Sequence, residues 1–386
     1  MKFSKMTFFP VGDKNGGMSL LSLSNGITIL IDCAIAADKI ADYCDINKEL
    51  RARLPADSEG RKYVDTFILT HRHDDHLTGF VDNFYLGPLS DYVKGSDKII
   101  IKELWSSHNF WKPESKDDTY KLCDDAKAFN KEMKRRVASF ESSHTIQAEG
   151  DRAIIIGKDP EGRTEKLSAI NYDIGTIITK INENDCSNKI SLTILGPLPQ
   201  QPEENDDDFA KDKNRQSIVL NIGVTEGQYA NNVLYGADAE CLVWEKCEIN
   251  YKKFLKYDLL YIPHHCSWHC ISMDSISDKG DDAKPSALAL SALGHKKMDS
   301  CFMVSQSKVI KDDDNDPPSY RAKKEYVKIG GENSQFYCTN EYPDEKHPKP
   351  LTFNFTCWGP QKETEKQESK VTSSNTDSTR EAYHHG

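Results

Sequence analysis

A run of ten residues, 70–79, has the residue types and the spacing of a metal site. It reads Thr-His-Arg-His-Asp-Asp-His-Leu-Thr-Gly, and within six positions it holds four potential ligands: His71, His73, Asp75 and His76. Imidazole nitrogens and carboxylate oxygens suit zinc, and also manganese or iron. The preceding residues, 64–69, are mostly apolar and β-prone, which predicts a buried strand that ends at the motif. The alternative is a polar loop that is rich in histidine without a chemical role.

A second candidate follows a strand predicted at 232–236. Gly236 and Ala237 are small enough for the backbone to pass close to something bulky, and Asp238 then stands at the end of the strand. This aspartate could supply the carboxylate that a dinuclear site needs. The alternative is an aspartate that caps the N-terminus of a helix.

The third candidate follows a strand predicted at 259–262 and reads Pro-His-His-Cys-Ser-Trp-His. Three histidines fall within six residues: His264, His265 and His269. Any one of them alone is more simply a core or surface histidine, but three together favour a site. A catalytic Cys266 is a further alternative, although no nucleophile-elbow sequence surrounds it.

The composition describes a chain of 386 residues with 37% hydrophobic residues and a net charge of −11. The charge argues against a surface that coats nucleic acid broadly, but it leaves room for a small basic groove or for a metal site that holds phosphates. The eleven cysteines are scattered without a CxxC pair, so they predict neither a zinc ribbon nor a disulfide framework. No stretch reaches the roughly 20 apolar residues of a membrane helix, and the N-terminus lacks a signal-peptide pattern. We expect a cytoplasmic protein that does not insert in membranes.

Many strands with interspersed helices predict a layered α/β sandwich. We expect one domain over residues 1–360, with a helical insertion at 106–150, and a disordered polar tail at 361–386. Helices are predicted at 36–53, 115–140 and 319–329. Strands are predicted at 18–23, 27–32, 64–69, 98–105, 151–156, 174–181, 190–195, 217–223, 232–236, 259–262, 301–305, 335–338 and 351–355.

The clusters together resemble the metallo-β-lactamase fold superfamily and, more narrowly, the stand-alone relatives of the metallo-β-lactamase domain of ComEC-type competence proteins. Residues 70–79 match the HxHxDHxxG signature. Residues 214–240 are similar to the family's Asn/Ser-Val-Val-Leu and Thr-Gly-Asp-Ala-Glu segments, and residues 258–267 resemble its His-His-Gly-Ser segment. The chain departs from these patterns where Ala237 and Cys266 replace glycines, and where Pro317 stands at a frequent histidine position.

The resemblance implies a four-layer αβ/βα sandwich with two divalent metal ions, zinc or alternatively manganese, at the strand edges. By this analogy His71 and His73 bind the first ion, Asp75 and His76 bind the second, and Asp238 bridges them. Either His264 or His265 completes the shell, and Asp32 orients the first cluster through hydrogen bonds. For the superfamily's third motif, a lone histidine, the candidates are His144 and then His108.

Two divalent ions lower the pKa of a water held between them, and such a site hydrolyses electrophilic carbon or phosphorus. We therefore expect a metal-dependent hydrolase, foremost a phosphodiesterase or nuclease that acts on nucleic acid or another phosphodiester. The catalytic residues would be Asp75, His265 and His269. One alternative is a hydrolase of a peptide, lactone or cyclic nucleotide. Another is a non-catalytic subunit that binds protein partners in a multi-protein system such as antiviral defence.

Overall fold

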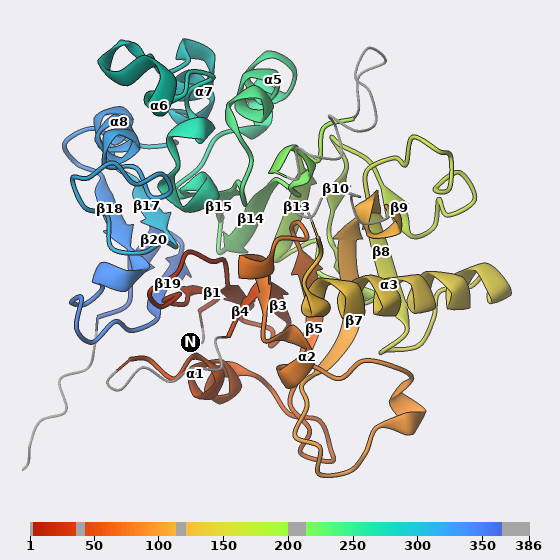
Figure 1. The fold of residues 1–386 in the computed structure, drawn as a ribbon. Coiled ribbons are helices and arrows are strands. Elements are labelled where there is room, and N and C mark those ends of the chain that lie inside the picture. Colours follow the sequence, from red (N-terminus) through yellow and green to blue (C-terminus); the bar gives the residue numbers. More distant parts are fainter. Residues whose placement is uncertain (1–2, 36–42, 113–120, 200–213, 365–386) are drawn as a thin grey trace, which may run out of the picture.

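The computed structural model describes residues 3–35, 43–112, 121–199 and 214–364. Two mixed β-sheets pack face to face in it, with helices on both outer faces (Figure 1). This is the predicted four-layer αβ/βα sandwich. The inner faces of both sheets share one hydrophobic core, in which Phe8 of the first sheet stacks on Tyr261 of the second at 6.2 Å between ring centroids.

The first sheet has nine strands. Five of them, β3, β5, β7, β8 and β9, run parallel to one another, so their carboxyl ends lie at one edge of the sheet. The strand order across this sheet is β20 (Gly359–Lys362), β19 (Leu351–Thr356), β1 (Lys5–Phe8), β2 (Ser19–Ser22), β3 (Thr28–Ile31), β5 (Tyr63–Leu69), β7 (Ile100–Ser107), β8 (Arg152–Ile156) and β9 (Asn171–Tyr172).

The second sheet has seven strands, and its last four are parallel. Two short pairs lie outside the main sheets: β4 (Cys33–Ala34) with β6 (Leu77–Thr78), and β11 (Lys180–Ile181) with β12 (Asn184–Asp185). The strand order across the second sheet is β10 (Ile177–Ile178), β13 (Ile190–Ile194), β14 (Leu220–Glu226), β15 (Tyr229–Tyr235), β16 (Leu259–Tyr261), β17 (Phe302–Ser305) and β18 (Gln335–Cys338).

The helices form the two outer layers (Figure 1). On the first sheet lie α1 (Ile46–Arg53), α2 (Phe80–Asn83) and α3 (Asp124–Ser143). On the second lie α5 (Cys241–Tyr251), α6 (Ile276–Lys279), α7 (Ala287–Leu293) and α8 (Tyr320–Gly330). None of the helices in the described residues combines the length and the apolar character needed to cross a membrane.

Several helices and strands have boundaries that differ from those predicted from the sequence. The helix expected at 36–53 is described only as α1, since 36–42 lie outside the described residues. The helix expected at 115–140 is described only as α3, which begins at Asp124 and connects the parallel strands β7 and β8, since 115–120 lie outside the described residues. The strand expected at 174–181 divides into β10 and β11. The start of the polar tail at 361 falls inside β20, and residues 365–386 lie outside the described residues.

Candidate metal centre

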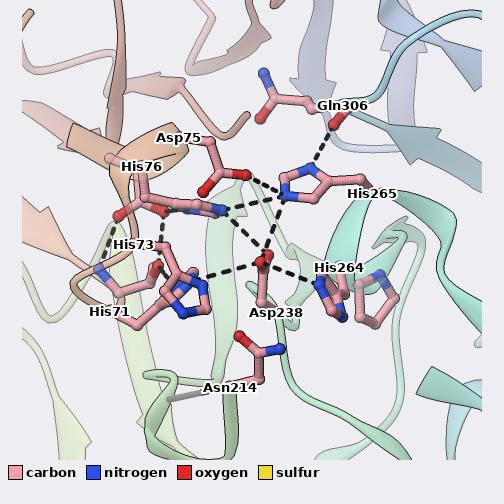
Figure 2. Close-up of polar contacts among 12 residues, drawn as sticks. His71, His73, Asp75, His76, Asn214, Asp238, His264, His265 and Gln306 are labelled. Carbon is pink, nitrogen blue, oxygen red and sulfur yellow. Dashed lines mark hydrogen bonds and ion pairs between the residues drawn. The ribbon is translucent and has the colours of Figure 1, made fainter. Parts of the chain in front are cut away.

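The three polar clusters meet where four strands end, two from each sheet (Figure 2). Asp32 directly follows β3, and the run from 70 to 76 follows β5. From the other sheet, Asp238 comes shortly after β15, and His264 and His265 come shortly after β16. Since the carboxyl ends of parallel strands share one edge of a sheet, segments nearly 200 residues apart are brought together.

One group consists of Asp75, His76, Asp238 and His265, whose ligand atoms all lie within 4.8 Å of one another. The Nε2 atom of His76 lies 3.2 Å from Asp238 Oδ1. The Nε2 atom of His265 lies 3.0 Å from Asp75 Oδ2 and 3.4 Å from Asp238 Oδ2. Two nitrogens and two carboxylates that converge in this way fit a divalent metal ion.

A second group consists of His71, His73 and Asp238, again with ligand atoms within 4.8 Å of one another. His71 Nε2 lies 3.0 Å from His73 Nδ1 and 3.4 Å from Asp238 Oδ2. Asp238 therefore belongs to both groups, as a bridging carboxylate would. Its buried Oδ1 atom has an ion-pair contact with His76 Nε2 at 3.2 Å but no well-aligned hydrogen bond from the described residues, so a cation would satisfy it.

Three histidines have their Nδ1 atoms engaged, which leaves Nε2 to point toward Asp238. His76 Nδ1 lies 2.8 Å from Asp32 Oδ2, and His265 Nδ1 donates to the backbone carbonyl of Gln306 at 2.8 Å. His71 Nδ1 lies 3.1 Å from Thr70 Oγ1, which itself donates to Asp32 Oδ2 at 2.7 Å. These partners assign the proton of each ring to Nδ1, so that Nε2 keeps a lone pair for a metal.

His264 lies beside the same carboxylate, and Figure 2 labels Asn214 in the same close-up. His264 Nε2 is 3.8 Å from Asp238 Oδ2, the oxygen that His71 also faces. Asn214 donates through Nδ2 to Glu240 at 2.7 Å, and its buried Oδ1 accepts no hydrogen bond from the described residues. Asn214 is missing from the predicted ligands, although the Asn-Arg-Gln-Ser run that begins with it is part of the family resemblance. The structure thus brings both histidines of the pair to Asp238.

The carboxylates and the histidines of the cluster shift one another's pKa values. Burial opposes ionisation of Asp238, but the surrounding histidines, His76 first, hold the pKa of this carboxyl well below its usual range. Burial also opposes protonation of His265, yet the Asp238 carboxylate raises the pKa of that imidazole to about 10. Burial lowers the pKa of His264 to about 4, so its ring is neutral at pH 7. Metal ligands must be neutral imidazoles, so metal binding would release protons here.

Two predicted site residues lie elsewhere. His144 is the exposed C-terminal cap of α3, with a left-handed φ of 54°, and it belongs to neither group. His269 is exposed and also belongs to neither group, because Ser267 caps a short 3₁₀ helix, Trp268–Cys270, that carries His269 away. His108, the second candidate for the third motif, is buried after β7. The N-cap position of α5 is Glu240 and not Asp238, so helix capping does not explain Asp238.

An αβ/βα sandwich with a His/Asp cluster at its strand ends is what the sequence resemblance implied. No protein-family model and no curated protein sequence matches the chain. Among solved structures, the chain is similar to CmlA, a diiron β-hydroxylase from Streptomyces venezuelae, with a TM-score of 0.40, 12% identity, 88% of this chain and 53% of CmlA covered. The chain thus spans about half the length of CmlA.

Two other solved structures resemble the chain. A diphosphatase of the PhnP family has a TM-score of 0.37 and 10% identity, with 91% of this chain and 98% of the diphosphatase covered. A long-form RNase Z from yeast has a TM-score of 0.32 and 11% identity, with 87% of this chain and 40% of the RNase covered.

Proposed function

We propose that this chain is a metal-dependent hydrolase and that its substrate is a phosphodiester. The observation that carries the proposal is the pair of ligand groups that share Asp238. The engaged Nδ1 atoms of His71, His76 and His265 support it, because they hold three rings in the tautomer that a metal requires.

Under this proposal His71, His73 and Asp238 hold one divalent ion, with His264 beside them. Asp75, His76, Asp238 and His265 hold the other. Zinc suits this set of nitrogen and oxygen donors, and manganese is the second candidate. Two bound ions would supply Lewis-acid chemistry and lower the pKa of a water molecule toward about 7.

Asp75 lies on the accessible side of the centre. Its side chain is 34% exposed, compared with 16% for His264 and 1% for His265. The substrate would therefore approach past Asp75, whose carboxylate could accept a proton from the attacking water. His265 has both ring nitrogens engaged, so its role in the proposal is that of a ligand and not of a proton donor to the leaving group.

The preference for a phosphodiester rests on the sequence resemblance to ComEC-type domains. The same centre could also hydrolyse a peptide, a lactone or a cyclic nucleotide, since fold alone does not fix a substrate. A non-catalytic role in binding a partner would not require three imidazoles whose Nδ1 atoms are engaged and whose Nε2 atoms point toward Asp238.

The test is hydrolysis of bis-p-nitrophenyl phosphate and of single-stranded DNA by protein loaded with zinc or manganese. Asp75→Ala should lower the rate by at least about 100-fold, because it removes a ligand and the accessible carboxylate. Asp74→Ala is the matched control, since Asp74 is the exposed neighbour with the same charge. Loaded protein that cleaves neither phosphodiester would exclude the proposed substrate, and cleavage of a lactone or peptide would replace it. Protein that binds no transition metal would exclude the mechanism.

A further inference from the structure

Arg72 lies between two potential metal ligands and carries a charge that the described protein does not balance. It is partly buried, and its one hydrogen bond in the described structure runs from Nη1 to the backbone carbonyl of Lys112 at 3.1 Å. No carboxylate of the described residues forms an ion pair with it. Burial is the cause that lowers the pKa of Arg72 to about 10.

Arg136 shows how the same fold treats a buried guanidinium that has a structural role. Its Nε donates to Glu132 Oε1 at 2.8 Å, and its two other nitrogens donate to backbone carbonyls at 3.1 Å each. The charge of Arg136 is thus matched by a carboxylate, and all three nitrogens are used. Arg72 uses one of three nitrogens and meets no carboxylate in the described residues.

A partly buried cation without a counter-charge costs free energy, and a guanidinium normally recovers it by binding a carboxylate or a phosphate with two parallel hydrogen bonds. Arg72 is also fixed in place, because its backbone runs between His71 and His73. Its head group reaches the segment after β7, which is the neighbour of β5 in the sheet. It therefore lies at the same strand edge as the ligand groups.

We propose that Arg72 is a substrate-binding residue of the metal centre and that its guanidinium takes a phosphate oxygen of the substrate. That the anion is a phosphate rests on the proposed function, whereas the need for an anion rests on the contacts of Arg72 alone. A substrate bound in this way would extend from the two ligand groups toward the end of β7.

The probe is inorganic phosphate, titrated calorimetrically into the full chain loaded with zinc. Arg72→Gln should weaken phosphate binding by about 10- to 150-fold, the usual effect of losing hydrogen bonds to a charged group. The phosphate affinity of Arg72→Lys should lie between those of the wild type and Arg72→Gln, because lysine keeps the charge and loses the planar guanidinium. Arg51→Gln is the matched control: Arg51 of α1 pairs with the exposed Asp97 away from the metal centre, and its replacement changes the net charge by the same amount.

Metal content measured by elemental analysis must equal that of the wild type, so that weaker phosphate binding is not a loss of metal. If Arg72→Gln does not fold, Arg72→Lys decides, and an unchanged dissociation constant in it overturns the inference. Equal phosphate binding by wild type and Arg72→Gln, or no phosphate binding by the wild type, overturns it as well. If phosphate binding depends on Arg72 but no phosphodiester is cleaved, this inference stands and the proposed function fails.

Discussion

Asp32→Asn tests whether second-layer hydrogen bonds prepare the centre for metal. Asp32 accepts three hydrogen bonds: Oδ1 from the Thr70 backbone N–H at 2.7 Å, and Oδ2 from Thr70 Oγ1 at 2.7 Å and from His76 Nδ1 at 2.8 Å. In asparagine an NH₂ donor replaces one acceptor. If the amide oxygen stays on the Thr70 N–H, the new donor faces His76 Nδ1. His76 must then accept at Nδ1 and carry its proton on Nε2, the nitrogen that points to Asp238.

The expected effect is a metal affinity lower by about 10- to 100-fold, or about 1.4–2.7 kcal/mol, with the fold nearly intact. The effect should be largest for the group that contains His76, and it should reach His71 through Thr70. Titration of the metal-free protein with zinc against a chromophoric chelator measures both affinities.

Asp65→Asn is an unusually close control. Asp65 accepts from the backbone N–H and the Oγ1 of Thr28 at 2.9 and 3.2 Å, so it repeats the Asp–Thr contact at the opposite end of β3 without a histidine. It should lose folding stability and keep its metal affinity. Wild-type affinity in Asp32→Asn, or an equal loss of affinity in Asp65→Asn, would refute the reasoning.

Two further predictions concern stoichiometry and acid stability. Because both groups share Asp238, Asp238→Ala should retain neither ion tightly, whereas Asp75→Ala should retain one, as counted by elemental analysis after dialysis; two ions in Asp238→Ala would contradict a shared ligand. His108 is buried, and burial, followed by the charge of Lys112, lowers its pKa to about 4. Since the unfolded pKa is about 6.5, the unfolded chain binds the proton first, and stability falls as pH drops from about 6.5 toward 4. Between pH 7 and pH 5 this linkage is worth about 2 kcal/mol, so His108→Leu should lose that much less in urea unfolding than the wild type, and an identical loss in both would contradict the linkage.

The strands were more predictable from the sequence than the helices. Mostly apolar runs such as 64–69 and 301–305 became β5 and β17, because strands buried on both faces carry few polar residues. The helix α5 was missed because its hydrophobic residues are not confined to one side: the charged Glu248 is buried, whereas the apolar Ile249 is exposed. The close approach predicted at Gly236 is confirmed: a Cβ atom there would lie 2.5 Å from the Trp244 ring.

The clusters of potential ligands could be predicted from the sequence, but the hydrogen-bond partners that orient them could not. The ligand types and the strand ends are visible in the sequence, but the partners that orient the rings are not local. Gln306 orients His265 through a backbone carbonyl, which no sequence pattern can report. Within the described residues, Asn214 Oδ1 accepts no hydrogen bond and the Arg72 guanidinium meets no carboxylate, and such absences can be seen only in three dimensions.

Backbone conformation explains why sequence spacing could not choose between His264 and His265. Both have left-handed backbones, with φ of 47° and 55°, and Cys266 follows with 69°. Ala237 has a φ of 45° and Asp32 a φ of 60°, so the turns after β3, β15 and β16 all pass through this region. A left-handed residue costs roughly 1–2 kcal/mol when it is not glycine, and it reverses the chain within one or two positions. Two adjacent histidines can therefore both face Asp238, which neither a strand nor a helix would allow.

The same geometry accounts for the glycines that the resembled family carries at positions 237 and 266. This chain places alanine and cysteine there and holds the turn by tertiary contacts instead, including a hydrogen bond of 2.8 Å from the His264 N–H to the Ala237 carbonyl.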